Sequence, residues 1–379
     1  MTRAFAYRRY TLPFRTPMRT AHGVWTQREG LLVRLETGDG KITFGECAPL
    51  PWFGTETVDE AAAACAALGA RVDDGQIEAI GAKYPCLGFA LESAMGRAKP
   101  PAEPSPHATA QPEASSCLPV AALLPAGRAA LEKIPALAGA GFRTFKWKVG
   151  ASRSSRPSDA ADEIALLDDV LGALPPGALL RLDANGAWTR RIAERWLARC
   201  ADYREHIEFV EQPVACAARD ARDAKDPSDA SDARDARGGE DLLLGLAGDY
   251  PTPLALDESV ATENGARRWL QLGWPGVFVI KPSLLGDADG TLAQLPPGRT
   301  VFSSALETAV GAQAALRAAF LFYAQSKIPN PQSKIPMALG FGVYPLFEDT
   351  RFDAPPAAPF VRATDLDKIN PEATWNALD

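Results

Sequence analysis

Residues 179–185 read Leu179-Leu180-Arg181-Leu182-Asp183-Ala184-Asn185, an apolar run of strand length that ends on charged and polar side chains. Two later runs have the same form and read Ile207-Glu208-Phe209-Val210-Glu211 and Leu254-Ala255-Leu256-Asp257. Lysines close two more, which read Phe145-Lys146-Trp147-Lys148 and Val277-Phe278-Val279-Ile280-Lys281. A buried charge is costly unless it is paired or bound to a metal ion, so these five runs point to one shared site.

The spacing of the runs indicates a repeated strand–helix unit. Asp183 and Glu211 lie 28 positions apart, and Glu211 and Asp257 lie 46 apart, or 28 without the 18-residue repeat at 219–236. We predict strands at 118–123, 142–149, 179–185, 207–212, 254–259, 276–282, 300–306 and 337–342, with amphipathic segments between most of them. About eight parallel strands alternating with helices are typical of an α/β fold of the TIM-barrel type.

The segment before residue 118 has a different pattern. We expect strands at 5–12 and 30–37, a hairpin turn at Asp39-Gly40, long loops at 13–29 and 47–57, and helices at 57–72 and 87–95. Residues 98–117 are rich in Pro, Ala and Ser and predict a linker. We therefore predict an α+β domain over 1–117, with 343–379 packing back on it, and a barrel over 118–342.

An insertion at 217–239 interrupts the barrel pattern. Its centre, residues 219–236, consists of six three-residue repeats rich in Arg, Asp and Ala. The charges nearly cancel and no apolar face recurs, so the segment predicts a solvated loop.

The composition of the chain limits the classes of molecule that it can bind. The net charge of −7 and the pI near 5.3 disfavour nucleic acid or an anionic membrane. The first residues lack the apolar core of a signal peptide, and the six cysteines show no CxxC pair, so we expect a reduced, cytoplasmic protein. With only three histidines, lysines and carboxylates must do the acid–base work. We expect a small-molecule carboxylate as the partner, and the sequence leaves the oligomeric state open.

The charged strand ends predict a metal-assisted proton transfer. Three carboxylates at one barrel mouth would repel each other without a cation, and single carboxylate oxygens suit Mg²⁺ better than Zn²⁺. The predicted ligands are Asp183, Glu211 and Asp257. Lys148 is the candidate general base, with Lys146 as the neighbouring cation. Alternatively, each acid is a surface residue paired with a nearby Lys or Arg.

Further residues are candidates for acid–base or substrate contacts. Lys281 could be a second acid or base, a cation that stabilises an enolate, or a partner in a structural ion pair. Asn185 shares a strand face with Asp183. The hydroxyls of Ser303 and Ser304, or the helix that follows, could hold a substrate carboxylate, or form a helix cap without a ligand. Gly340 could let the backbone approach a ligand, or could simply form a turn.

These residues resemble the enolase superfamily, and within it the muconate-lactonizing subgroup. The resemblance covers nearly the whole chain and rests on the five runs quoted above. The stretches Arg19-Thr20-Ala21-His22-Gly23 and Gly45-Glu46-Cys47-Ala48-Pro49 are similar to capping-domain loops of that superfamily. Within the subgroup, residues 302–311 and 339–342 resemble the o-succinylbenzoate synthases.

The resemblance implies a (β/α)7β barrel under an α+β capping domain, with Mg²⁺, or Mn²⁺ in its place, on Asp183, Glu211 and Asp257. It implies that Lys148 removes the proton α to a carboxylate, that the metal and Lys281 stabilise the enediolate, and that Lys148 then helps the β-hydroxyl leave as water. The implied enzyme is a carbon–oxygen hydro-lyase. It would convert 2-succinyl-6-hydroxy-2,4-cyclohexadiene-1-carboxylate to 2-succinylbenzoate in menaquinone or phylloquinone biosynthesis.

Two other functions remain open. One is a racemase of N-acylamino acids or an epimerase of dipeptides on the same scaffold, with Lys148 and Lys281 on opposite faces of the substrate. A dipeptide epimerase typically has an acidic residue near the end of the last barrel strand, whereas residues 338–342 contain none. The other is a barrel that binds a ligand without catalysis, which the retained acids and lysines disfavour.

Overall fold

The computed structural model describes residues 2–20, 23–96, 117–150, 157–216, 230–325 and 336–378. The chain divides into two compact units: unit 1 consists of Met1–Pro119 and Ile280–Asp379, and unit 2 of Val120–Val279. Residues 98–116 of the linker predicted at 98–117 lie outside the described residues, as does His22, and Cys117 at the end of that prediction belongs to a strand. The domain limits at residues 117 and 342 stay predictions.

Unit 1 begins with an antiparallel sheet in the order β3-β2-β1-β4. Its strands are β1 (Arg3–Thr20), β2 (Gly23–Glu36), β3 (Ile42–Cys47) and β4 (Arg71–Val72). The hairpin predicted at Asp39-Gly40 is confirmed, because β2 and β3 pair across it. The loop predicted at 13–29 is wrong for most of its length, since β1 and β2 remain paired from Pro13–Gln27 to Thr20–Gly23 with one irregularity. Cross-strand pairing there outweighs the local composition.

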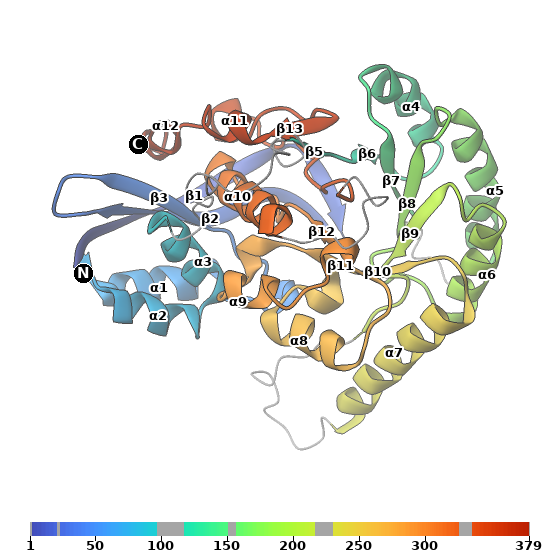
Figure 1. Cartoon of the computed structure of the whole chain (residues 1–379), viewed down its shortest axis with the longest axis horizontal. Coiled ribbons are helices and arrows are strands. Elements are labelled where there is room, and N and C mark those ends of the chain that lie inside the picture. The colour runs from blue at the N-terminus through green and yellow to red at the C-terminus, as the bar shows by residue number, and fades with distance from the viewer. Residues whose placement is uncertain are drawn as a thin grey trace, which may run out of the picture. The chain divides into compact units, whose positions relative to one another are not determined.

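Three helices lie on one side of this sheet (Figure 1). They are α1 (Val58–Leu68), α2 (Asp74–Gly81) and α3 (Pro85–Ala94). The helix expected at 87–95 is confirmed, and the one expected at 57–72 is confirmed except at its end, where residues 71–72 form β4. The helix α2 was not predicted. Its sequence signal is the capping box of Asp73 and Gln76, whose side chains each accept from the other's backbone N–H. The loop at 47–57 contains a single 3-10 turn at Pro51–Phe53.

The C-terminal part of unit 1 carries a long buried helix, α10 (Ala309–Gln325), directly after strand β12 (Thr300–Phe302) and a six-residue turn. Smaller elements are β5 (Cys117–Pro119), α9 (Ala288–Leu292), β13 (Phe360–Arg362), α11 (Ala363–Leu366) and α12 (Pro371–Asn376). β13 pairs antiparallel with β5. Where a strand was expected at 337–342, Gly340 makes a single parallel bridge to Ser303.

Unit 2 holds parallel strands that alternate with helices. The strands are β6 (Ala122–Leu124), β7 (Thr144–Lys148), β8 (Leu179–Asp183), β9 (Ile207–Glu211), β10 (Leu254–Leu256) and β11 (Val277–Ile280). The helices are α4 (Ala129–Gly139), α5 (Pro157–Ala173), α6 (Arg190–Ala201), α7 (Ala230–Asp249) and α8 (Glu263–Gln271). Figure 1 shows α4, α5 and α6 along one side of strands β7–β9.

The strands follow one another in the sheet in chain order, from β6 to β12. Neighbouring strands pair in parallel, as a chain of βα units requires. This arrangement confirms the predicted α/β class and the TIM-type strand order. The carboxyl ends of β7 to β10 therefore lie along one edge of the sheet.

The insertion is partly helical. Residues 217–229 lie outside the described residues, but α7 begins at Ala230, so the loop predicted for 219–236 is wrong at its C-terminal end. Alanine and arginine are strong helix formers, and the end of the repeat lies in the same helix as the apolar run at Leu242-Leu243-Leu244, whose middle residue is fully buried. Among the described helices, none has the length and hydropathy needed to span a bilayer.

Candidate active site

Neighbouring strands of unit 2 align the charged residues that the sequence singles out. β7, β8 and β9 pair with Lys148 opposite Asp183 and Asp183 opposite Glu211. Ala255 of β10 lies opposite Glu211, and Asp257 follows directly after that strand. The ends of four adjacent strands therefore carry the predicted base and the three predicted metal ligands.

The two faces of β7 differ as the alternation predicts. Trp147 is fully buried, whereas Lys146 and Lys148 are half-buried. The Trp147 ring packs edge-on against Trp196 with centroids 6.3 Å apart, and Trp196 stacks on Trp188 at 5.2 Å. This aromatic layer fixes the apolar face of β7 and keeps both lysines on the other face.

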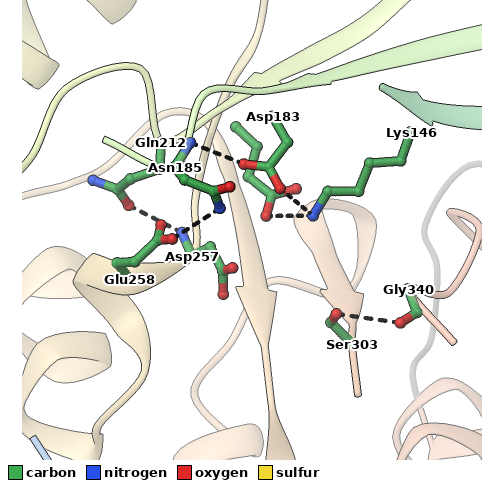
Figure 2. Close-up of polar contacts among 9 residues, drawn as sticks. Lys146, Asp183, Asn185, Gln212, Asp257, Glu258, Ser303 and Gly340 are labelled. Atoms are coloured by element: carbon green, nitrogen blue, oxygen red, sulfur yellow. Dashed lines mark hydrogen bonds and ion pairs between the residues drawn. The ribbon is translucent and has the colours of Figure 1, made fainter. Parts of the chain in front are cut away.

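Lys146 bridges two of the carboxylates. Its Nζ lies 2.9 Å from Asp183 Oδ2 and 2.8 Å from Glu211 Oε1 (Figure 2 labels the Lys146–Asp183 pair). Burial alone would lower the pKa of the Lys146 ammonium, but Asp183, Glu211 and Asp257 outweigh it and raise that pKa above its ordinary range. Lys146 is therefore a charged counter-ion in this arrangement, and its predicted part in proton transfer stays a prediction.

Glu211 is the most buried of the three acids, at 1% exposure. Burial raises the pKa of its carboxyl well above the ordinary value; Lys146 lowers that pKa, and Asp183 and Asp257 raise it further. The three carboxylates thus act on one another through a poorly solvated space, which makes a cation beside them favourable.

The donor chemistry of this group fits a divalent cation. In the described part of the chain, no three His, Cys, Asp or Glu side chains already stand close enough together to enclose a metal ion. Asp183 and Glu211 nevertheless each direct one oxygen at a single cationic nitrogen, and Asp257 acts electrostatically on the same nitrogen. Single carboxylate oxygens around one cationic position are the donors that Mg²⁺ prefers.

Asn185 connects the end of β8 with the turn after β10. Its backbone N–H donates to Asp183 Oδ1 at 3.0 Å, and its Nδ2 donates to Glu258 Oε1 at 3.1 Å (Figure 2). Its Oδ1 is buried and accepts no hydrogen bond from the described residues. The substrate contact predicted for Asn185 stays a prediction, and this oxygen is the atom that could make it.

Gln212 is a site residue that sequence reasoning missed. Its Oε1 accepts from the backbone N–H groups of Asp257 (3.1 Å) and Ser259 (3.3 Å), while its Nε2 donates to Val214 O (3.0 Å) and Ser259 Oγ (2.8 Å). The side chain is 1% exposed. It therefore fixes the backbone at Asp257 from the end of the adjacent strand. The signal in the sequence that could have indicated this role is the position of the Gln212 amide directly after the predicted ligand Glu211.

Backbone strain gathers at these strand ends. Among the described residues, three non-glycine residues have positive φ: Asn185 (45°), Gln212 (37°) and Leu306 (63°). Asn185 and Gln212 follow predicted metal ligands within two residues, and Leu306 lies in the turn after β12. The left-handed conformation costs an L-residue about 1–2 kcal/mol, and such residues cluster where a site demands an unusual turn.

Lys281, Ser303, Ser304 and Gly340 belong to unit 1. Lys281 follows β11, is 8% exposed, and holds its Nζ 5.2 Å from the ring centroid of Phe53. A cation over an aromatic face is attracted by the ring quadrupole, so Phe53 helps to place this ammonium.

The two serines differ in their bonding. Ser303 Oγ donates to Gly340 O at 3.3 Å (Figure 2), and a Cβ at position 340 would lie 2.5 Å from that hydroxyl. Glycine at 340 is thus required by a close approach. Ser304 Oγ accepts from Leu306 N–H at 2.9 Å and donates to Glu307 Oε2 at 2.7 Å. The roles predicted for these four residues of unit 1 stay predictions.

Two parts of the chain match family models. Residues 1–97 match "MenC, N-terminal domain", and residues 129–234 match "Enolase C-terminal domain-like". The chain is 38% identical over 312 residues to an o-succinylbenzoate synthase from Thermosynechococcus vestitus, across 80% of this chain and 84% of that relative. It is 30% identical over 240 residues to a hydrophobic dipeptide epimerase from Roseobacter litoralis, across 56% of this chain and 62% of that relative.

A solved structure extends this similarity. The crystal structure of the o-succinylbenzoate synthase from Thermosynechococcus elongatus BP-1, complexed with Mg in the active site, superposes with a TM-score of 0.72. It is 33% identical, and the match covers 99% of both chains. Hence the predicted fold, a TIM-type barrel of the enolase type with an N-terminal antiparallel domain, is confirmed, and the chain belongs to the o-succinylbenzoate synthase family of enzymes, which are lyases of the enolase superfamily.

Proposed function

We propose that this enzyme dehydrates 2-succinyl-6-hydroxy-2,4-cyclohexadiene-1-carboxylate to 2-succinylbenzoate, as the family name indicates. The observation that carries the proposal is the pairing of Lys148 with Asp183, beside carboxylates that already converge on one cation. A base next to a cation-binding carboxylate cluster is what proton abstraction α to a carboxylate requires.

Asp183, Glu211 and Asp257 are the residues that would hold Mg²⁺, with Mn²⁺ as a possible substitute. A bound divalent cation would polarise the substrate carboxylate and stabilise the negative charge that forms on it. The chain's own residues then complete the reaction. Lys148 takes the α-proton, Lys281 offsets the developing charge, and Lys148 returns its proton to the departing β-hydroxyl, which leaves as water. One C–H and one C–O bond break, and the ring gains a double bond.

The remaining parts of the proposal concern the surroundings of the site. Residues 1–117, with 343–379, would form the capping domain, and residues 118–342 the barrel. Asn185, Ser303, Ser304 and Gly340 would contact the substrate, directly or by shaping its surroundings. The partner would be a small carboxylate in menaquinone or phylloquinone biosynthesis, and the location cytoplasmic.

Two experiments test the reaction and its metal. Purified chain should convert the cyclohexadiene acid to 2-succinylbenzoate, followed by absorbance and mass spectrometry. Treatment with EDTA should abolish this conversion, and added Mg²⁺ should restore it. Full activity after EDTA treatment would contradict the proposed dependence on a metal ion.

The epimerase relative makes a second activity worth an explicit test. On that alternative, Lys148 and Lys281 would exchange the α-proton of an N-succinylamino acid or a dipeptide on opposite faces. The chain offers no acidic residue at 338–342, where Ala338, Leu339 and Phe341 are buried, so we favour dehydration. Incubation with an N-succinylamino acid in D₂O decides the matter. Fast α-deuteration with inversion, and no dehydration of the cyclohexadiene acid, would assign the chain to the alternative.

A further inference from the structure

The turn between β12 and α10, residues 303–308, is held by a carboxylate from β3. Glu46 is 1% exposed and lies at the first turn of α10. Its Oε1 accepts from Thr308 N at 2.8 Å and from Tyr10 Oη at 2.6 Å. Its Oε2 accepts from Gly311 N at 2.8 Å and from the Thr308 hydroxyl. Four donors thus converge on one carboxylate: two belong to Thr308 at the end of the turn, one to Gly311 of α10, and one to Tyr10.

Arg28 of β2 holds the carbonyl side of the same turn. Its guanidinium is 2% exposed and donates to Leu306 O at 3.2 Å and to Ala305 O at 3.4 Å. Further hydrogen bonds run to Pro49 O at 2.8 Å and to Ala48 O. Leu306 is the turn residue with a φ of 63°, so the guanidinium stabilises the strained part of the turn.

Glycine at position 311 makes the approach of Glu46 possible. A Cβ there would lie 3.0 Å from Glu46 Oε2 and 2.8 Å from Glu307 Cβ. The sequence therefore supplies both the carboxylate, at the end of β3, and a glycine in the first turn of α10 that leaves room for it.

This network leaves little of the turn for direct contact with a ligand. Two backbone N–H groups that could receive a substrate carboxylate, those of Thr308 and Gly311, donate to Glu46 instead, and Val310 N–H donates to the Thr308 hydroxyl. Ser304 is 4% exposed, and its hydroxyl is hydrogen-bonded to Leu306 N–H and Glu307 Oε2. Among the described residues, the Ser303 hydroxyl makes one hydrogen bond, the long 3.3 Å contact with Gly340 O, so it is the hydroxyl of the turn that can change partner most easily.

We propose that Arg28 and Glu46 are positioning residues, which hold the turn at 303–308 so that Ser303 is presented to the substrate while Ser304 and the start of α10 serve the turn itself. The inference rests on the proposed function, because it assigns the turn a role in binding that substrate. Neither residue takes part in proton transfer. Their loss should weaken substrate binding and leave the chemical step nearly unchanged.

The charge balance around the turn agrees with this role. Arg28, Glu46 and Glu307 are all buried, and the positive charge of Arg28 acts on the Glu307 carboxyl. Burial, and to a lesser extent the negative charge of Glu46, raise the pKa of Glu307 to about 7 against the lowering effects of the Ser304 hydrogen bond and of Arg28. Glu46 thus accepts four hydrogen bonds in surroundings that disfavour the ionisation of the neighbouring Glu307 carboxyl.

The test compares Glu46→Gln and Arg28→Lys with matched changes in β2, Glu36→Gln and Arg34→Lys. Arg34 and Glu36 pair with each other at 2.8 Å, and among the described residues no hydrogen bond or ion pair links their side chains to the turn. In Glu46→Gln an amide NH₂ faces two donors, and in Arg28→Lys the forked geometry is lost. We expect KM for the cyclohexadiene acid to rise about tenfold, as for the loss of one charge-assisted hydrogen bond, with kcat changed less than about twofold.

Amide hydrogen exchange gives a second readout that needs no substrate. Residues 303–311 should exchange about tenfold faster in both variants, and at the wild-type rate in the two controls. Thr308→Val, which removes only the hydroxyl bonded to Glu46, repeats the test if Glu46→Gln does not fold. The inference is overturned if KM stays at the control value, even where exchange in the turn accelerates, or if kcat falls and KM does not rise.

Failure of the proposed function looks different. In that case the wild-type chain itself does not dehydrate the cyclohexadiene acid. The variants are then compared by α-deuteration of an N-succinylamino acid, and equal KM values for the wild type, the variants and the controls would overturn the inference there too.

Discussion

Replacing Gln212 by alanine should weaken both the fold and the candidate metal site. The wild-type side chain makes four hydrogen bonds of 2.8–3.3 Å at 1% exposure, to two backbone N–H groups, one carbonyl and one hydroxyl. Each is worth about 1 kcal/mol net, and more when its buried partner is left unsatisfied. We therefore expect Gln212→Ala to lower the free energy of unfolding by about 4 kcal/mol.

Urea denaturation in EDTA measures this loss without any contribution from a metal. The matched control is Gln294→Ala, because Gln294 is exposed and its Nε2 makes one hydrogen bond, to Gly290 O at 2.8 Å. The control should change stability by less than about 0.5 kcal/mol. A separate Mg²⁺ titration of activity should show an affinity about 10–100-fold lower in Gln212→Ala, as for other lost supports of metal ligands. The reasoning is refuted if Gln212→Ala is as stable as the control.

Three further predictions concern catalysis, pH and cysteine reactivity. Lys148→Ala should reduce turnover of the cyclohexadiene acid by at least about 10³-fold while the circular dichroism spectrum stays unchanged; surviving activity would exclude Lys148 as the base. Because burial raises the Glu307 pKa from 4.5 to about 7, the folded chain retains a proton that the unfolded chain has released, and stability contributed by this group falls as pH rises from about 4.5 through 7. Glu307→Gln should therefore gain stability relative to wild type across that range in urea denaturation, and a constant difference would contradict the assignment. Four of the six cysteines are buried, and burial raises the pKa of their thiols; they are Cys47, Cys65, Cys86 and Cys200. A disulfide reagent should therefore modify these four only after unfolding, and fast labelling of more than two of the six cysteines in the native protein would contradict the structure.

Local sequence patterns were sufficient to predict which residues lie at the strand ends of the barrel. The alternation in β7 predicts which side chains share a face, and the structure buries Trp147 and leaves Lys146 and Lys148 on the other side. The regular spacing of Asp183, Glu211 and Asp257 predicts that they follow successive parallel strands, which the pairing of β8, β9 and β10 confirms. In each case the signal lies within one strand or one βα unit.

Contacts between distant segments were not predictable in the same way. Glu46 and Thr308 are separated by 262 positions, and nothing in the sequence near either residue indicates the other. Gln212 follows a charged neighbour and resembles a residue that points away from the site, although its amide holds the backbone of Asp257. The strands β1 and β2 run through a stretch rich in Pro and Thr because each supplies hydrogen bonds to the other.

The strained turns at Asn185, Gln212 and Leu306 bear on how such an enzyme can evolve. At about 1–2 kcal/mol each, they consume a noticeable share of the 5–15 kcal/mol by which a folded domain is stable. Glycine in their place would relieve the strain, yet would also free the backbone beside the carboxylates and beside Ser303. Selection for higher stability and selection for higher activity thus act in opposite directions at these three positions. Substitutions that stabilise the helices elsewhere increase the number of substitutions that the site can accept without unfolding the protein.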